Sequence, residues 1–118
     1  MDELAFLTAT EQAGLIRRGE VSSRELVELY LGRIERLDPE LNAFVTVCGE
    51  EALATEPADG PFRGVPIPIK DLQETAGIRT TFSSLAYADY VPDFDVAVVR
   101  RLKEAGFVVI GKTNSPEL

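Results

Sequence analysis

The chain has 118 residues, a formal net charge of −8, one cysteine and no histidine. The acidic balance argues against a nucleic-acid-binding surface, which needs clustered lysine and arginine, and against attachment to an anionic membrane. The lack of histidine excludes Ser-His-Asp and Cys-His nucleophile systems from this segment and removes the commonest metal ligand. A general base in this segment must therefore be a carboxylate or a lysine.

The cysteine content and the hydropathy of the chain favour a cytoplasmic protein. A single cysteine, Cys48, excludes an intrachain disulfide, and its apolar neighbours predict a small buried side chain. The amino terminus is acidic, unlike that of a signal peptide. No apolar stretch approaches the roughly 20 residues of a membrane span. We therefore expect a reducing, cytoplasmic location.

Two helices are predicted to open the chain. Thr8 and Glu11 have the spacing of a capping box, which indicates the start of a short helix. Ser22 and Glu25 repeat that spacing, and apolar residues then recur at helical intervals. Because proline does not fit a helix interior, Pro39 is expected to end the second helix.

The second half of the chain alternates strands and helices. Apolar runs at residues 43–48 and 107–110 predict two buried strands. Between them, Asp95 is expected to cap a helix that runs to Ala105. Residues 115–117, Ser-Pro-Glu, resemble the start of a further helix. This order of elements indicates an α/β fold.

An extended stretch between two irregular segments leads to a lysine. Pro66 and Pro68 each lack a backbone N–H, so a regular central strand would be incomplete here. The stretch delivers Lys70 and Asp71 to the end of an apolar element. A free lysine has a pKa of about 10.4 and acts as a base only where burial lowers that value. The apolar run suggests such burial for Lys70, but the spacing alone favours the alternative, a surface lysine paired with Asp71 or another carboxylate.

One motif points to a different function. Residues 106–113 match G-x-x-x-x-G-K-[ST], the pattern of phosphate-binding loops. The four variable positions are Phe, Val, Val and Ile, which favour a strand rather than a turn around phosphate. A helix is also predicted before the first glycine, where a strand is required. We therefore expect Gly106 to end a helix and Gly111 to end a strand, without a nucleotide.

Several segments, in order, resemble the amidase signature family. Residues 64–71, GVPIPIKD, are similar to its lysine segment, usually G-V-P-(I/L)-x-(I/V)-K-D. Residues 71–84 resemble the D-L-x-x-x-x-G-x-x-T-T segment that follows, although Ser83 stands where a glycine is frequent. Residues 95–102 and 106–117 resemble D-A-x-V-V-x-x-L and A-G-x-x-x-x-G-K-T-N with Pro-Glu after it. The resemblance covers nearly the whole chain.

The resemblance implies a fold and a division of the chain. Residues 1–118 would be the N-terminal part of the family's α/β/α sandwich, which contains a mixed sheet. Within them, residues 1–40 would form a helical opening and residues 41–118 the α/β part. Because this piece would only begin a large sheet, we also expect it to expose apolar surface.

The resemblance also implies a mechanism and a role for one residue. The family hydrolyses a carboxylic amide to an acid and ammonia or an amine with a Ser–cis-Ser–Lys unit, which needs neither a metal nor a cofactor. Neutral Lys70 would be the catalytic base and accept a proton from the bridging serine. Asp71 would either help to position its neighbour or be structural. Both serines lie in a Gly/Ser-rich segment that these residues do not contain, so we expect the chain alone to be inactive.

Partners and alternatives follow from the same resemblance. The expected partner is a small-molecule amide, with no nucleic acid and no membrane, and the whole protein could form a homodimer. A close alternative is the A subunit of a glutamine-dependent tRNA amidotransferase, the subunit that liberates ammonia from glutamine. An alternative of another class is a non-catalytic binding or folding module.

Overall fold

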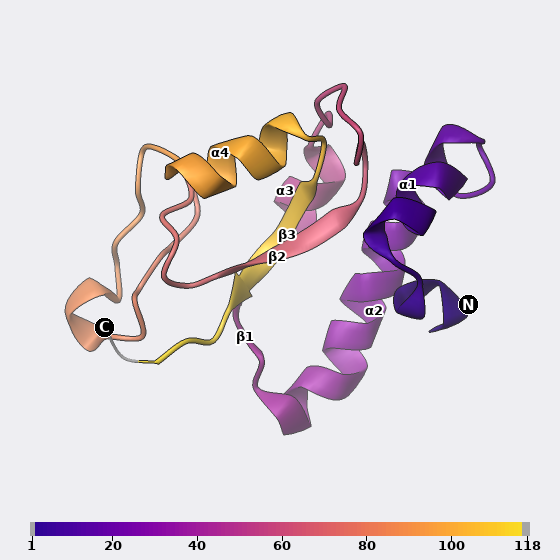
Figure 1. Ribbon diagram of the computed structural model, residues 1–118. Coiled ribbons are helices and arrows are strands. Elements are labelled where there is room, and N and C mark those ends of the chain that lie inside the picture. The colour runs from indigo at the N-terminus through magenta and orange to yellow at the C-terminus, as the bar shows by residue number, and fades with distance from the viewer. Residues whose placement is uncertain (1, 117–118) are drawn as a thin grey trace.

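The computed structural model describes residues 2–116 as a small mixed sheet between two layers of helices (Figure 1). Along the chain the elements are η1 (Asp2–Phe6), α1 (Ala9–Arg17), α2 (Ser23–Leu41), β1 (Phe44–Val47), α3 (Gly49–Ala54), β2 (Pro66–Lys70), η2 (Leu85–Tyr87), α4 (Ala97–Glu104) and β3 (Val108–Thr113). The predicted α/β/α arrangement with a mixed sheet is confirmed.

Both predicted capping boxes form. The Thr8 hydroxyl accepts from the Glu11 N–H at 3.0 Å, and the Glu11 carboxylate accepts from the Thr8 N–H at 3.3 Å. Ser22 and Glu25 make the same reciprocal pair at 3.0 Å each. Each box satisfies two backbone donors that the first turn of a helix would otherwise leave free.

The predicted end of α2 is wrong, because Pro39 lies inside the last turn and the helix continues to Leu41. Proline removes one backbone donor but keeps a helical φ, so a final turn can contain it. The chain leaves the helix at Asn42, which has a left-handed φ of 53° and donates its N–H to the Asp38 carbonyl at 2.7 Å. Asparagine is one of the few residues that tolerates this conformation.

The three strands have the order β1-β3-β2, with β3 in the centre. β3 is antiparallel to β1 and parallel to β2. The strand predicted at residues 43–48 is confirmed, but it is half-buried rather than buried, and Val47 is 47% exposed. β1 lies at the edge of the sheet and pairs with one neighbour, β3, which is consistent with this exposure.

The two prolines of β2 are compatible with a strand because it lies at the other edge. The Val65 carbonyl and the Asp71 N–H each bond to β3 at 2.9 Å. Backbone groups at these odd positions therefore face β3, and Pro66 and Pro68 face the free edge. The donors that the prolines lack would have pointed away from the sheet, so the ladder loses nothing.

The prediction that Gly111 ends a strand is wrong, because β3 continues to Thr113. Gly111 is needed inside the strand for a close approach: an added Cβ would lie 2.5 Å from the Thr46 carbonyl oxygen and 2.9 Å from the Phe44 ring. Within the described residues nothing helical follows β3, and the helix start predicted at residues 115–117 lies partly outside them.

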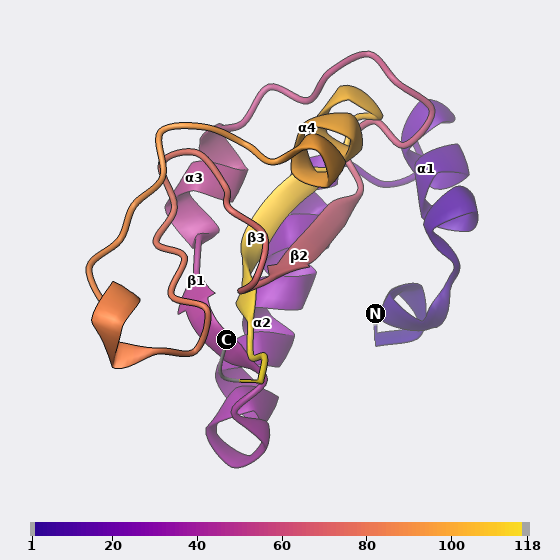
Figure 2. The same cartoon turned by 60° about the vertical axis from the view of Figure 1, so that its left-hand side comes forward.

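Each face of the sheet has its own apolar cluster, and α2 and α4 lie on opposite sides of the strands (Figure 2). The cluster beneath α2 and α3 contains Val27, Ala52, Val108 and Ile110. The cluster beneath α4 contains Ile69, Val99 and Val109. Among the described helices, none is long and apolar enough to span a membrane.

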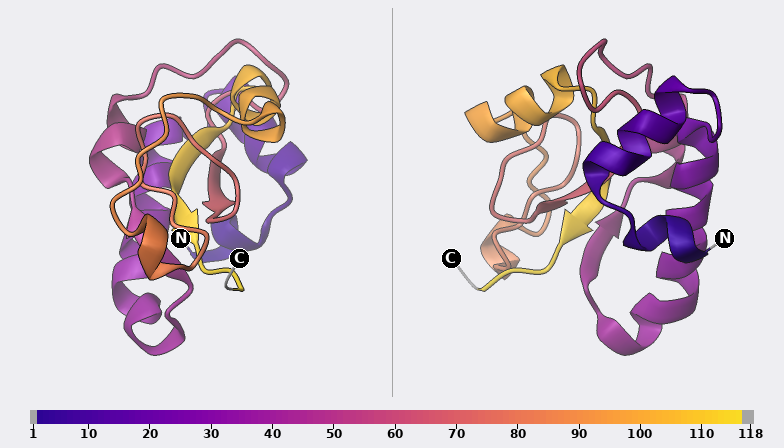
Figure 3. Two further views of the ribbon diagram at one scale, coloured as in Figure 1. Left: turned by 90° about the vertical axis from the view of Figure 1, so that its left-hand side faces the viewer. Right: turned by 45° about the vertical axis from the view of Figure 1, so that its right-hand side comes forward.

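The predicted cap of α4 is wrong, since the N-cap residue is Val96 and the helix begins at Ala97. The Asp95 carboxylate instead accepts from the Ala76 N–H at 2.8 Å and from the Lys103 ammonium at 3.0 Å. Asp95 therefore ties the long irregular segment before α4 to the helix. This segment lies with the end of β3 on the side of the molecule away from α1 (Figure 3).

Candidate active site

Lys70 is the last residue of β2, and its side chain is exposed. Its ammonium group makes no hydrogen bond or ion pair with another residue in the range 2–116. The predicted burial is therefore wrong for these residues: the apolar run buries Ile69, and alternation along the strand sends the next side chain to the other face. The surface position in the alternative is confirmed, but its pair with Asp71 is wrong, because Asp71 is buried and has another partner.

A β-bulge decides which face each lysine occupies. β3 has one residue more than β2 between their paired positions, and after this irregularity Lys112 lies opposite Ile69 and Lys70 opposite Thr113. Ile69 belongs to the cluster beneath α4, so Lys112 points to that face. If side chains alternated regularly from Ile110 onward, Lys112 would share the face of Ile110, beneath α2. The bulge therefore redirects one side chain, as bulges near functional sites often do.

Lys112 is fully buried and has three polar neighbours. Its ammonium group donates to the Thr80 hydroxyl at 2.7 Å and to the Gln73 carbonyl at 3.0 Å, and it lies 3.6 Å from an Asp71 carboxylate oxygen. Both charged side chains are 0% exposed. Burial lowers the pKa of Lys112, while the Asp71 carboxylate acts in the opposite direction.

Asp71 links the end of the sheet to the segment that follows it. Its carboxylate accepts from the Thr81 hydroxyl at 2.5 Å and from the Thr81 N–H at 3.2 Å. Its backbone N–H donates to the Thr113 carbonyl at 2.9 Å, and its carbonyl accepts from the Phe82 N–H at 3.0 Å. We call Asp71, Thr80, Thr81 and Lys112 the Lys112 cluster. The cluster holds the segment that follows β2 against the end of β3.

The Lys112 cluster was not predicted from the sequence. Lys112 was interpreted only as part of a phosphate-loop pattern, and the expectation that this pattern forms no such loop is confirmed: Val108–Thr113 is a strand. The partners of Lys112 come from a segment more than 30 residues earlier in the chain, so no local spacing could reveal them. A lysine within an otherwise apolar strand was the available signal, because a buried charge requires a partner.

The backbone at Ser83 has a conformation that suits glycine, the residue that the resemblance led us to expect there. Phe82 and Ser83 both have a φ of 54°, in the left-handed region that costs a residue with a Cβ about 1–2 kcal/mol. The Ser83 hydroxyl donates to the Ser115 carbonyl at 2.5 Å and lies 2.9 Å from the Ser115 hydroxyl. These contacts offset part of the conformational cost.

The variants Ser83→Gly and Ser83→Ala separate the two effects. Both lose the hydroxyl contacts with Ser115, but only glycine relieves the left-handed conformation. We expect the glycine variant to be more stable than the alanine variant by about 1 kcal/mol, measured by urea unfolding. Equal stabilities would contradict a strained backbone at this position.

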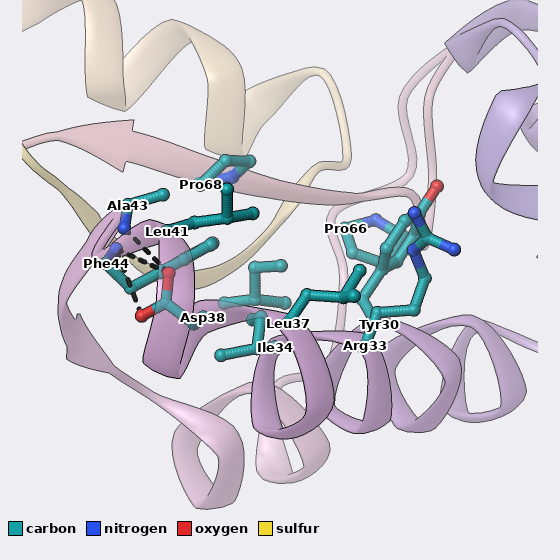
Figure 4. Close-up of a pocket in the computed structure, with 11 residues that line it drawn as sticks. Tyr30, Arg33, Ile34, Leu37, Asp38, Leu41, Ala43, Phe44, Pro66 and Pro68 are labelled. Atoms are coloured by element: carbon teal, nitrogen blue, oxygen red, sulfur yellow. Dashed lines mark hydrogen bonds between the residues drawn. The ribbon is translucent and has the colours of Figure 1, made fainter.

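An apolar groove of about 320 Å³ lies between α2 and the sheet, beside β2 (Figure 4). Its lining residues are Tyr30, Arg33, Ile34, Leu37, Asp38, Leu41, Ala43, Phe44, Pro66, Pro68 and Ile110. Asp38 is already engaged, since its carboxylate accepts from the backbone N–H groups of Ala43 and Phe44 at 2.7 and 3.3 Å. Lys70 lies two residues beyond Pro68 on the same face but does not line the groove. The expected exposed apolar surface is present here.

Cys48 is buried as predicted, and burial raises the pKa of its thiol to about 11, with a smaller contribution from Glu51. At pH 8 this lowers the thiolate fraction about a hundredfold relative to a thiol with a pKa of 9.0. We therefore expect a thiol reagent at pH 8 to label the folded chain at least about a hundredfold more slowly than the urea-unfolded chain. Comparable labelling rates would contradict the burial.

The raised pKa of Cys48 also predicts a loss of stability in alkali. A folded-state pKa above the unfolded value stabilises the protein at pH values below the unfolded pKa, and this contribution is lost as pH rises through the folded pKa. The window here runs from about pH 9 to about pH 11. Urea unfolding across this range checks the expectation. Cys48→Ala should flatten the decline, and an unchanged decline in this variant would assign it to other groups.

The described residues contain no group of three His, Cys, Asp or Glu side chains that could hold a metal ion. At the end of β2, the primary amine of Lys70 is exposed. The neighbouring Asp71 carboxylate is paired with Lys112 on the opposite face of the sheet. When neutral, such an amine can accept a proton from a group placed next to it.

Comparison with known proteins gives one consistent result. A family model described as Amidase matches residues 25–118. A curated relative, the A component of glutamyl-tRNA(Gln) amidotransferase from Moorella thermoacetica, is 45% identical over 98% of this chain and 26% of its own length. Among solved structures, 6-aminohexanoate cyclic dimer hydrolase has a TM-score of 0.87 at 40% identity, covering 94% of this chain and 24% of its own. Native peptide amidase of Stenotrophomonas maltophilia has a TM-score of 0.87 at 35% identity, covering 96% and 26%.

The chain thus spans about a quarter of the length of the relatives it matches. The agreement in fold extends over nearly all of the chain, so the elements that carry Lys70 and the Lys112 cluster lie within the matched region.

Proposed function

Because the chain belongs to the amidase family, we propose that the whole protein hydrolyses a carboxylic amide and that Lys70 is its general base. The observation that carries this proposal is the placement of Lys70. It ends β2 without a hydrogen-bond or ion-pair partner in residues 2–116, although an acidic residue follows it directly. An amine held in this way is free to face groups supplied by the rest of the protein.

In the proposed reaction, neutral Lys70 accepts a proton from a bridging serine. This serine takes a proton from a nucleophilic serine as the nucleophile's oxygen attacks the amide carbonyl. The proton then passes to the leaving nitrogen, the C–N bond breaks, and an acyl-enzyme remains. Water attacks the acyl-enzyme and releases the acid. The products are the acid and ammonia or an amine, and no redox change occurs.

A second candidate function is that of the A component of a tRNA amidotransferase. It is favoured by the name of the Moorella thermoacetica relative, which is 45% identical to this chain. On this reading, ammonia released from an amide donor would be transferred to an acyl group on tRNA, and the partners would include other protein chains and a tRNA. The acidic composition therefore does not exclude assembly with a nucleic acid, and the predicted absence of such a partner is not retained.

Four expectations accompany the proposal. The division into residues 1–40 and 41–118, the cytoplasmic location and a homodimer of the whole protein stay predictions. The expected inactivity of the 118-residue chain alone also stays a prediction, for which ammonia release by this chain is the measurement.

The experiment measures ammonia and amine release from a panel of amides by a polypeptide that joins this chain to the serine-bearing segment of its family. The panel includes glutamine, asparagine, a peptide amide and a simple aliphatic amide. Turnover of the peptide or aliphatic amides supports the amidase, and turnover confined to glutamine or asparagine supports the amidotransferase component. If the polypeptide folds but hydrolyses none of these amides, the hypothesis that remains is a non-catalytic binding or folding module.

A further inference from the structure

The carboxylate beside the proposed base is held out of its reach. Asp71 follows Lys70 in the sequence, yet its carboxylate is 0% exposed and lies 3.6 Å from the Lys112 ammonium group. Lys112 reaches this position because the β3 bulge directs it to the face beneath α4. The two lysines at the ends of β2 and β3 therefore occupy opposite faces of the sheet.

This separation matters for a general base. A free carboxylate next to a lysine favours the charged ammonium form, which cannot accept a proton. An isolated buried carboxylate is equally unfavourable, because an unpaired charge in the interior loses its hydration. Pairing Asp71 with a second lysine resolves both problems, since the carboxylate is balanced and Lys70 is left unpaired.

We propose that Lys112 is a positioning residue for Lys70: it balances the charge of Asp71 and holds that carboxylate on the opposite face of the sheet. This inference deepens the proposed amidase function and rests on it. The hydrogen bonds of the Lys112 cluster fix the Asp71 carboxylate, and the bond from the Asp71 N–H to Thr113 fixes the backbone beside Lys70. Lys112 itself does not touch the reacting atoms.

The charged and titratable groups around the two lysines are few. Asp71 and Glu74, from the segment after β2, and Cys48, between β1 and α3, act on Lys112. On the face of Lys70, Arg33 and Asp38 of α2 line the groove beside β2. Of these neighbouring groups, the variants described next change only Asp71.

The test reads the state of Lys70 directly in the 118-residue chain. Acetic anhydride is applied in a brief pulse between pH 7 and pH 11, and acetylation of the Lys70 peptide is quantified by mass spectrometry. The variants are Lys112→Met, Asp71→Asn and the double variant. Lys103→Met is the matched control, because Lys103 also pairs with a carboxylate, Asp95, that anchors the same segment.

Opposite shifts are expected for the two single variants. Lys112→Met leaves the Asp71 charge unbalanced and should move the acetylation profile to higher pH by about half a unit. Asp71→Asn leaves Lys112 unbalanced and should move it to lower pH. The double variant removes both charges and should return the profile to that of the unmodified chain, while Lys103→Met should not move it. If Lys112→Met does not fold, the acetylation profile of Asp71→Asn is compared with that of the double variant instead. The profile of Asp71→Asn should then lie at lower pH.

A cluster that only stabilises the fold would behave differently. The double variant lacks the bonds from Lys112 to Thr80 and Gln73, so a purely structural effect would persist in it. Coincident profiles for all variants, or a double variant that shifts with Lys112→Met, would overturn the proposal. Acetylation does not depend on amide hydrolysis, so a failure of the proposed function would be recognised separately, as hydrolysis that survives the loss of Lys70.

Discussion

Lys112→Met is expected to lower the free energy of unfolding by about 3–5 kcal/mol, the usual cost of removing one partner of a buried ion pair. The substitution leaves the 0% exposed Asp71 carboxylate without its cation and removes the donor to Thr80 and Gln73. Methionine is similar in length to lysine, so the loss reports charge and hydrogen bonds rather than an empty cavity. Urea unfolding followed by circular dichroism measures it.

Lys103→Met provides the comparison. Lys103 lies 3.0 Å from Asp95, but their side chains are 38% and 19% exposed. A partly solvated pair contributes at most about 1 kcal/mol. A loss for Lys112→Met no larger than that for Lys103→Met would show that Lys112 is not held in a buried pair.

The second large effect is expected at Lys70. In the polypeptide that includes the family's serines, Lys70→Ala should lower kcat/KM for amide hydrolysis by about 10²–10⁴-fold, the range that general-base catalysis supplies. The free energy of unfolding should change by less than about 0.5 kcal/mol, because Lys70 is exposed and has no partner among the described residues. Steady-state kinetics and urea unfolding of the same preparation measure both. A large loss of stability together with activity would assign Lys70 a structural role.

Much of the fold could be predicted because its signals are local. Each capping box is contained within four residues, and the strand predicted at 107–110 is an uninterrupted apolar run. The Pro39 error was local, because a final helical turn tolerates proline, but other errors arose where a residue's partners are distant. Asp95 has a sequence typical of a helix cap, but it is engaged by Ala76 and Lys103.

The candidate site was predictable only in part. The apolar run before Lys70 correctly indicated an extended stretch that ends at this residue, although the prolines argued against the regular strand that forms. Which side chain a strand buries depends on the faces that helices cover. That information is not contained in the run itself. The Lys112 cluster depends on a bulge in β3 and on a segment about 40 residues earlier, so neither its members nor their faces follow from local spacing. At Ser83 the resemblance indicated only a local backbone difference, and the left-handed φ itself could not be predicted.

On the proposed mechanism, Lys70 acts by accepting a proton and not merely as a positive charge. The most direct measurement is amide hydrolysis by the Lys70→Arg variant of the polypeptide that includes the family's serines. Arginine keeps the charge and much of the length, but it stays protonated at the pH of the assay. We predict that Lys70→Arg is as inactive as Lys70→Ala while its unfolding curve is unchanged. Activity in the arginine variant close to that of the unmodified enzyme would contradict the account.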